Sequence, residues 1–331
     1  MKIFVIGKLR SITHWTEDCV AGFRAAGHTV HLAISRNPRI AVGIERLLMS
    51  RWTGAFPVRR ICRQIRAFQP DLILVIDPYA GHASLLARVA ALRDRPPMVG
   101  WVGDQYPDGA RDIAGLFDAV AYTDTGLLAL HRDRGFVADA AYVPHAANPR
   151  LDLGVGDPAS RNARMVFVAN PTPHRSEVVA GLREPVALYG PGWDGQADGR
   201  HDVHARRVGI EELAAIYRGH LAVLNIRNEQ NVMHGLNQRH FDPCLSGTPV
   251  VTDNQPDVSA CFEPGREMLV YRDIDELNEI HARMLREPGY ALEIGKRGRR
   301  RVMDHHLYGH RLEALARLGG IPQISDRRSR P

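Results

Sequence analysis

Short apolar runs alternate with amphipathic stretches along the first 143 residues of the chain. Continuous apolar runs predict buried strands, and apolar residues at helical spacing predict helices between them. Strands separated by helices are typical of a parallel, doubly wound α/β sheet. The expected strands span residues 3–7, 29–34, 72–76, 98–102, 119–122 and 141–143, and the expected helices span 15–26, 52–68 and 83–92.

The same alternation begins again after a stiff connector. Pro144 and Pro149 bracket this connector, so we expect the domain boundary between residues 147 and 148. Two successive α/β sheets place a ligand at the carboxyl ends of their strands. Residues 321–331 are expected to form a disordered tail. The second series has expected strands at 165–169, 186–189, 221–226 and 268–271, a further strand from residue 250, and expected helices at 210–218, 275–286 and 290–304.

Length and composition fit a globular chain with two domains. The chain has 331 residues, of which 44% are hydrophobic and 24% are charged, as in ordinary globular proteins. No apolar run reaches the length of a membrane span, and the apolar N-terminus is too short for a signal peptide. The four cysteines show no metal-binding spacing. We therefore expect a reduced, cytoplasmic protein.

The net charge of +6 lies wholly in residues 1–150. This excess favours an anionic acceptor, or peripheral contact with the inner face of a membrane. The basic stretch at 52–68 has Ile61 and Ile65 on one face, which favours a helix packed on the sheet over a membrane-surface helix. No motif that reads nucleic acid is evident, so we expect no nucleic-acid partner.

Residues 234–251 carry the strongest functional pattern. They predict a loop, a helix over 237–246, a turn at Gly247 and a buried strand. The unpaired N–H groups at the start of such a helix favour an anion. Arg239 lies near that start, and Asp242 lies one turn further on. A cation at the phosphates and an acid at the sugar hydroxyls suit a nucleotide sugar.

This segment resembles the donor-binding motif of GT-B glycosyltransferases, in which two acids separated by seven residues precede an Ala/Cys-Gly-Thr-Pro-Val-Val run. When the two are aligned on Gly247, Asp242 falls on the second acid and His234 falls on the first. The CgeB-like (spore maturation protein) glycosyltransferase group carries Asn-x-Arg-x-Phe-Glu here, which residues 237–242 match with Asp in place of Glu. The likeness continues through residues 261–271.

The resemblance implies an α/β protein of GT-B fold, with two Rossmann-like doubly wound domains facing across a cleft. In this fold the first domain, 1–147, binds the acceptor, and the second, 148–308, binds the nucleotide sugar. A C-terminal helix at 309–320 returns to the first domain. The implied activity is that of a hexosyltransferase-like glycosyltransferase, which moves a sugar from a nucleotide-diphosphate donor to an acceptor hydroxyl.

The resemblance also implies roles at the donor site. The second acid of the motif binds the ribose, so this role is expected of Asp242. Without a metal, cations and N–H groups must neutralise the leaving diphosphate, and Arg239 is the first candidate. No Asp-x-Asp motif is evident, so we expect metal-independent catalysis and no cofactor. Gly235 and Asn237 lie beside Arg239, and His234 either touches a phosphate or sugar hydroxyl or has lost the first acid's role.

Three further donor-site candidates follow expected strands of the second domain. Arg227 follows the strand at 221–226 and either binds the diphosphate or pairs with a surface acid. Gly190 follows the strand at 186–189, where a glycine allows close approach of a ligand. Trp193 either stacks on the base or packs beneath a plain turn.

The acceptor-side candidates follow strands of the first domain. Asp104 is the candidate base that takes the acceptor hydroxyl's proton in an inverting displacement, with structural hydrogen bonding as an equal alternative. Asp77 and Tyr79 end another strand and are expected to line the acceptor pocket with Tyr106. His14 is the second catalytic candidate, with a cap or wall role as its alternative.

Two other functions fit the same residues. A nucleotide-sugar epimerase of this fold would convert the donor without any acceptor. A non-catalytic sugar-binding or envelope-maturation protein would bind the donor without turnover, and the replacement of the first acid by His234 favours keeping this alternative.

Overall fold

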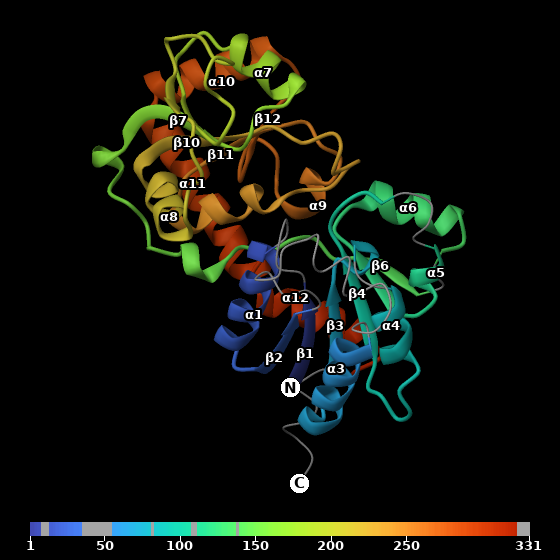
Figure 1. Cartoon of the computed structure of the whole chain (residues 1–331). Helices are drawn as coiled ribbons and strands as arrows, with labels where there is room; N and C mark the ends of the chain where they lie inside the picture. The colour runs from blue at the N-terminus through green and yellow to red at the C-terminus, as the bar shows by residue number, and fades with distance from the viewer. Residues whose placement is uncertain (8–12, 35–54, 81–82, 107–110, 137–138, 323–331) are drawn as a thin grey trace. The chain divides into compact units, whose positions relative to one another are not determined.

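The structure is a computed structural model that describes residues 1–7, 13–34, 55–80, 83–106, 111–136 and 139–322. The chain divides into two compact units. The first unit comprises Met1–Pro144 with Tyr308–Pro331, and the second unit comprises His145–Leu307. Each unit is built around a parallel sheet flanked by helices (Figure 1), which confirms the predicted α/β class.

The described strands of the first unit form a six-stranded parallel sheet. Their order is β2-β1-β3-β4-β5-β6. Every residue of β3 and β4 is buried, so both faces of the sheet are covered, and such strands read as continuous apolar runs. The strands are β1 (Lys2–Gly7), β2 (Thr29–Ile34), β3 (Leu72–Ile76), β4 (Met98–Val102), β5 (Ala119–Tyr122) and β6 (Ala140–Tyr142).

The last helix, α12, completes the first unit from the far end of the chain. Tyr308 at its start packs edge-on against Phe23 of α1, with ring centroids 6.1 Å apart. Figure 1 shows red α12 beside blue α1. The described helices of this unit are α1 (Thr13–Ala25), α3 (Ala55–Phe68), α4 (Ala83–Ala90), α5 (Arg111–Ala114), α6 (Thr125–Asp133) and α12 (Tyr308–Leu318), with a 3-10 turn, η1 (Pro78–Ala80).

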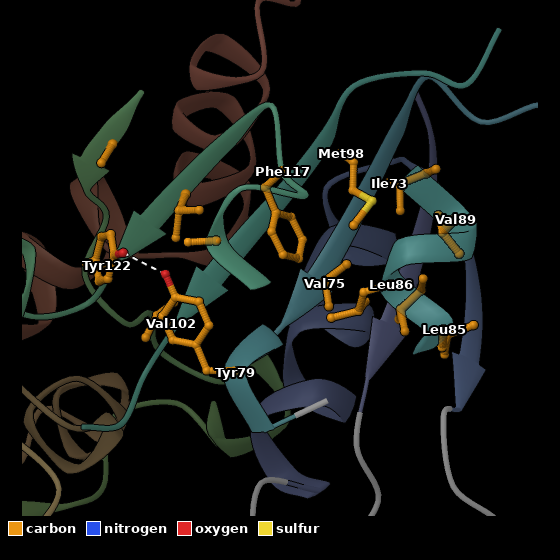
Figure 2. Close-up of a cluster of buried hydrophobic side chains, with 14 of the residues drawn as sticks. Ile73, Val75, Tyr79, Leu85, Leu86, Val89, Met98, Val102, Phe117 and Tyr122 are labelled. Atoms are coloured by element: carbon orange, nitrogen blue, oxygen red, sulfur yellow. Dashed lines mark hydrogen bonds between the residues drawn. The ribbon is translucent and has the colours of Figure 1, made fainter. Parts of the chain in front are cut away.

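The apolar face of α3 packs into the core of the first unit. Ile61 and Ile65 are buried there, one helical turn apart. Figure 2 shows the neighbouring strand residues Ile73 and Met98 and the α4 residue Leu86 in the same cluster. The packing confirms that α3 directs its apolar face at the sheet, while its arginines stay outside. Among the described helices, none is long and apolar enough to cross a membrane.

The described strands of the second unit also form a six-stranded parallel sheet, in the order β12-β11-β10-β7-β8-β9. The strand order reverses between the neighbours β7 and β10, and we call this place the switch point. In open α/β sheets, ligands bind outside the carboxyl ends of the strands at such a point. The strands are β7 (Asn162–Val168), β8 (Ala187–Tyr189), β9 (Asp202–His204), β10 (His220–Asn225), β11 (Val250–Asp253) and β12 (Leu269–Tyr271).

Helices and 3-10 turns connect these strands. Asn278 of α10 ties that helix to the end of α7, because its Nδ2 donates to the carbonyl of Gly181 at 3.0 Å. The described helices are α7 (Pro173–Ala180), α8 (Ile210–Gly219), α9 (Val258–Cys261), α10 (Ile274–Arg286) and α11 (Pro288–His305), and the 3-10 turns are η3 (Pro149–Leu151), η4 (Pro158–Ser160), η5 (Gln238–His240) and η6 (Asp242–Ser246).

The apolar runs of the sequence predict the bounds of most strands to within a few residues. The strands at 29–34, 72–76, 98–102 and 119–122 have the expected bounds. The sequence pattern does not predict β9, whose three residues are all half-buried, nor the helices α6, α7 and α9. The expected tail lies outside the described residues from residue 323 onward.

Candidate functional site

The segment at 237–246 does not form the expected helix. It folds as two 3-10 turns, η5 and η6, separated at Phe241. Pro243 has no N–H to donate to the carbonyl four residues earlier, so a continuous α-helix is broken there. The side chain of Asn237 accepts the N–H of Arg239 at 2.9 Å, and its carbonyl accepts the N–H of His240 at 3.1 Å. The predicted anion site at a helix N-terminus is therefore wrong.

Arg239 nevertheless lies at the switch point, held by its side chain. Its Nε donates to Oδ1 of Asn225, the last residue of β10, at 3.1 Å. No carboxylate of the described residues forms an ion pair with the Arg239 guanidinium, which is half-buried. Burial lowers the pKa of Arg239, and the negative charge of Asp242 opposes this effect.

A second arginine, Arg175, lies beside Arg239. It belongs to the first turn of α7, and only 5% of it is exposed. Its Nε donates to the carbonyl of Ile226 at 3.2 Å, and its Nη1 donates to the carbonyl of Asn170 at 3.0 Å. Within the part of the chain that the structure describes, Arg175 forms no ion pair. Burial and the neighbouring charge of Arg239 lower the pKa of Arg175 to about 10.

Consecutive residues at the end of β10 hold these two residues, which we call the arginine pair. Arg239 is bound by Asn225 and Arg175 by the next residue, Ile226. Arg175 follows β7 and Arg239 follows β10, the two strands that flank the switch point. The sequence does signal the start of α7, where Thr172 caps the helix and Pro173 occupies its first turn, but the role of Arg175 depends on a contact 51 residues away.

Arg227 differs from the arginine pair because it has acidic partners. Its Nε lies 3.5 Å from Oδ2 of Asp253, and its Nη2 lies 3.3 Å from Oε1 of Glu229. The structure therefore shows the alternative in which Arg227 pairs with acids. Burial raises the pKa of Asp253, and Arg227 opposes that rise.

A buried polar network lies behind Arg239. His240 Nε2 lies 3.0 Å from Asn225 Nδ2 and 3.0 Å from Thr252 Oγ1. Gln255 Nε2 extends the network to Oδ1 of Asp253 at 3.0 Å. Burial lowers the pKa of His240 to about 3, so its ring is neutral near pH 7 and carries no charge into the site.

The remaining donor-motif residues have structural contacts. Asp242 is buried, and its Oδ1 accepts the backbone N–H of Asn148 at 2.8 Å, which ties the connector to η6. His234 is half-buried, and its carbonyl accepts the N–H of Asp257 at 3.3 Å. Gly235 is buried next to it. Contact of Asp242 with a ribose and of His234 with a sugar or phosphate remain predictions.

Trp193 does not offer its ring to a base. The residue is 0% exposed, its Nε1 donates to the carbonyl of Ala169 at 2.7 Å, and its ring packs edge-on against Phe167. The close approach at Gly190 is also internal, because a Cβ there would lie 2.4 Å from the carbonyl oxygen of Ala169. The packing alternative holds for Trp193, and its predicted stacking on a base is wrong. A ligand contact at Gly190 stays a prediction.

A pocket of about 610 Å³ opens at the carboxyl ends of β11 and β12. Its lining includes His174, which neighbours Arg175, together with Arg227, Asp253 and Tyr271. The volume is within the range of small-molecule sites. The pocket therefore borders Arg227 and the start of α7, and neither Arg175 nor Arg239 is among its lining residues. Among the described residues, no group of three His, Cys, Asp or Glu side chains is arranged to hold a metal.

In the first unit, the ends of β3 and β4 bring three predicted residues together. The hydroxyl of Tyr106 donates to Oδ2 of Asp77. Asp77 is buried with a φ of 51°, a conformation that few residues other than glycine adopt. Burial and the adjacent Asp77 carboxylate raise the pKa of Tyr106, and the half-buried Asp104 adds to this rise.

Tyr79 lies in the core instead of lining a pocket. Its hydroxyl hydrogen-bonds to that of Tyr122 at 2.8 Å, as Figure 2 shows, and Tyr122 bonds to Nδ1 of His131 at 2.9 Å. Burial raises the pKa of Tyr79 to about 12. The predicted acceptor-side role of Tyr79 is therefore corrected to packing. His14 lies in the first turn of α1, and its side chain is outside the described residues.

A sequence comparison matches part of the chain to a family model, and comparisons of structure cover nearly the whole chain. Residues 173–317 match a family model described as glycosyl transferase-like. No curated protein matches the sequence.

Three solved structures illustrate the similarity of fold. Sucrose-phosphate synthase from Thermosynechococcus elongatus superposes with a TM-score of 0.68 at 14% identity, over 96% of this chain and 98% of that one. HepE from Anabaena, in complex with UDP and glucose, gives 0.68 at 13% identity over the same shares. UDP-GlcNAc 2-epimerase from Neisseria meningitidis gives 0.55 at 9% identity, over 96% and 99%. The chain therefore has the GT-B fold, and most of its second unit, together with α12, matches glycosyl transferase-like proteins.

Proposed function

We propose that the protein is a glycosyltransferase that moves a sugar from a nucleotide-diphosphate donor to an acceptor hydroxyl. The match of residues 173–317 to a glycosyl transferase-like family supports the reaction class. The structure of HepE from Anabaena in complex with UDP-glucose, a neighbour in fold, supports a nucleotide sugar as donor. The likeness of residues 237–242 to the CgeB-like group refines the proposal to that group.

The arginine pair is the observation that carries this proposal. Two guanidinium groups that repel each other lie at one strand end, and neither forms an ion pair among the described residues, although Asp253 and Asp242 partly offset the repulsion from a greater distance. Such an arrangement is unfavourable in the empty protein and becomes favourable when an anion binds between the two charges. A nucleoside diphosphate supplies two phosphate groups, and charge-assisted hydrogen bonds to them are the strongest kind available to a side chain.

The same pair suggests how the leaving group is stabilised. When the sugar leaves, negative charge grows on the terminal phosphate of the nucleoside diphosphate. Fixed cations aimed at that oxygen stabilise the transition state more than the ground state. Arg175 and Arg239 supply this stabilisation in our proposal, so catalysis does not depend on an added divalent metal.

The first unit supplies the acceptor side of the proposed reaction. Asp104 follows β4 and is half-buried, so its carboxylate is within reach of a bound acceptor. It takes the proton of the acceptor hydroxyl as the new glycosidic bond forms. Asp77 and Tyr106 hydrogen-bond to each other beside it and shape this end of the sheet.

A transfer assay tests the proposed function. The protein is incubated with UDP-glucose and other nucleotide sugars, with and without a panel of hydroxyl-bearing acceptors, and products are followed by mass spectrometry. We expect nucleoside diphosphate and glycosylated acceptor in equal amounts, and loss of both in Arg175→Ala and Arg239→Ala. Release of nucleoside diphosphate without any glycosylated acceptor contradicts the proposal.

An epimerase is the second candidate, because UDP-GlcNAc 2-epimerase shares the fold with a TM-score of 0.55. An epimerase converts the nucleotide sugar with no acceptor present. The no-acceptor arm of the same assay distinguishes the two, since an altered donor sugar in that arm favours epimerisation.

A further inference from the structure

We propose that Asn225 is a positioning residue that aims Arg239 at the donor diphosphate through a neutral hydrogen bond, without forming an ion pair with the arginine. This inference rests on the proposed function, in which Arg239 binds that diphosphate. It adds a residue of β10 whose own side chain is not required to touch the donor.

The contacts of Asn225 place it directly behind Arg239. Asn225 is 0% exposed and ends β10. Its Oδ1 accepts from Nε of Arg239 at 3.1 Å and from Nδ2 of Asn237 at 3.3 Å. The Nε bond fixes the plane of the guanidinium but leaves the two terminal nitrogens of Arg239 without a partner among the described residues. Those nitrogens are the ones that bind phosphate oxygens in a fork.

The network behind Asn225 fixes the orientation of its amide. Arg239 can only donate, so the oxygen of Asn225 must point at it, and Nδ2 must point at His240. His240 lies behind this amide, with Nε2 3.0 Å from Nδ2 of Asn225. Nδ1 of His240 accepts the backbone N–H of Asn237 at 3.1 Å, in the capping box of η5. Residues of η5 and its cap therefore hold both the ring and the amide, and the oxygen of Asn225 stays directed at Arg239.

An amide at position 225 has a property that a carboxylate lacks. Both groups offer an oxygen to Nε of Arg239 in almost the same shape. A carboxylate would also form a buried ion pair with the guanidinium and compete with the diphosphate for its charge. Asn225 provides the hydrogen bond without the competing charge, in contrast to Asp253, which pairs with Arg227.

Two variants separate the parts of this proposal. Asn225→Ala removes the anchor, and Asn225→Asp keeps the anchoring oxygen but adds charge. Asn278→Asp is the matched control, because Asn278 is also a buried asparagine of the second unit, with its Oδ1 and Nδ2 bound to the backbone of Arg183 and Gly181. It introduces a buried carboxylate on α10, where no contact with Arg239 exists.

UDP affinity is measured by calorimetry for each variant, with folding checked by circular dichroism. We expect Asn225→Asp and Asn225→Ala each to weaken UDP binding tenfold or more, and Asn278→Asp to leave it within twofold. Wild-type affinity in Asn225→Asp overturns the charge argument. If Asn225→Asp does not fold, the UDP affinities of Asn225→Ala and of its double variant with Arg239→Ala decide whether Asn225 positions Arg239.

A double-mutant cycle tests whether Asn225 acts through Arg239. When two residues act through one contact, their effects do not add. The Asn225→Ala/Arg239→Ala variant should therefore bind UDP no more weakly than Arg239→Ala alone, an outcome that a merely structural role would not give. Fully additive losses overturn the positioning role. Unchanged affinity in Arg239→Ala would instead refute the proposed donor site itself, so the two failures are distinguishable.

Discussion

The two units use the same sheet architecture but treat charge at their strand ends in different ways. At the end of β10 in the second unit, Arg175 and Arg239 have no ion-pair partner among the described residues, and neutral groups hold them in place. At the ends of β3 and β4 in the first unit, Asp77 is bonded to the hydroxyl of Tyr106. In our proposal the second unit binds the anionic donor at the arginine pair, and the first unit binds a hydroxyl-bearing acceptor near these acids and hydroxyl groups.

The comparison also shows that the number of charges near a strand end is a poor guide to function. Arg227 lies closer to β10 in sequence than Arg239, yet Asp253 and Glu229 bind it. What distinguishes the arginine pair is the kind of group that holds each guanidinium. Backbone carbonyls and an amide oxygen orient an arginine and leave its charge available.

The largest expected effect is on the rate of sugar transfer, and it tests the acceptor role proposed for the first unit. Asp104→Asn keeps the shape of the side chain and removes the proposed base, so transfer should slow by about 10²–10⁴-fold. UDP affinity should not change, because the proposed donor site lies in the second unit. Single-turnover transfer and calorimetry measure the two quantities.

Asp112→Asn is the control for Asp104→Asn, since Asp112 is an exposed acid of α5 in the same unit. It should transfer at the wild-type rate. Near-normal transfer by Asp104→Asn would remove this residue as the base and leave it a structural role in the loop before Tyr106.

A second prediction uses a feature that both units share, a buried neutral histidine. Burial lowers the pKa of His240 in the second unit to about 3 and that of His131 in the first unit to about 4. The unfolded chain protonates these rings near pH 6.5, before the folded protein does. The stability that depends on neutral rings is therefore complete above pH 6.5 and is lost as the pH falls towards 4 and 3.

Between pH 7.5 and pH 5, each ring should lower the free energy of unfolding by about 2 kcal/mol. Urea unfolding at the two pH values measures this change. His240→Gln and His131→Gln should each reduce the loss on acidification by removing one titrating ring. A wild-type protein equally stable at both pH values would show that the rings are not held neutral.

The smallest expected effect concerns metal. Because the arginine pair is proposed to neutralise the leaving diphosphate, excess EDTA should leave the transfer rate unchanged. The assay compares EDTA with added magnesium or manganese. Activity abolished by EDTA and restored by either metal would mean that the two arginines do not suffice.

The sequence predicts the fold better than the site, for physical reasons. Strands such as β3 are buried on both faces, so local composition alone identifies them. The helix predicted at 237–246 does not form, because Pro243 interrupts it and the Asn237 side chain accepts the N–H of Arg239. The sequence leaves Trp193 between contact with a ligand and packing in the core, and its complete burial assigns it to the core.

Arg175 shows what sequence patterns cannot supply. Its neighbours in the chain identify it only as a residue of a helix start. Its place in the arginine pair depends on its hydrogen bond to the carbonyl of Ile226 and on the nearby charge of Arg239, and both residues are distant in sequence. A motif marks Arg239 in the sequence, but the structure holds it through the side chain of Asn225 and not at a helix N-terminus.

The most direct test of the arginine pair is the affinity for UDP of Arg175→Ala and Arg239→Ala, measured by calorimetry against wild type. Loss of a charge-assisted phosphate contact weakens binding by roughly 1.5–3 kcal/mol, so each variant should bind about 10- to 100-fold more weakly. Arg183→Ala is the control, because Arg183 forms an exposed ion pair with Asp275 in the same unit, and it should bind like wild type. Wild-type affinity in both folded pair variants would contradict the account.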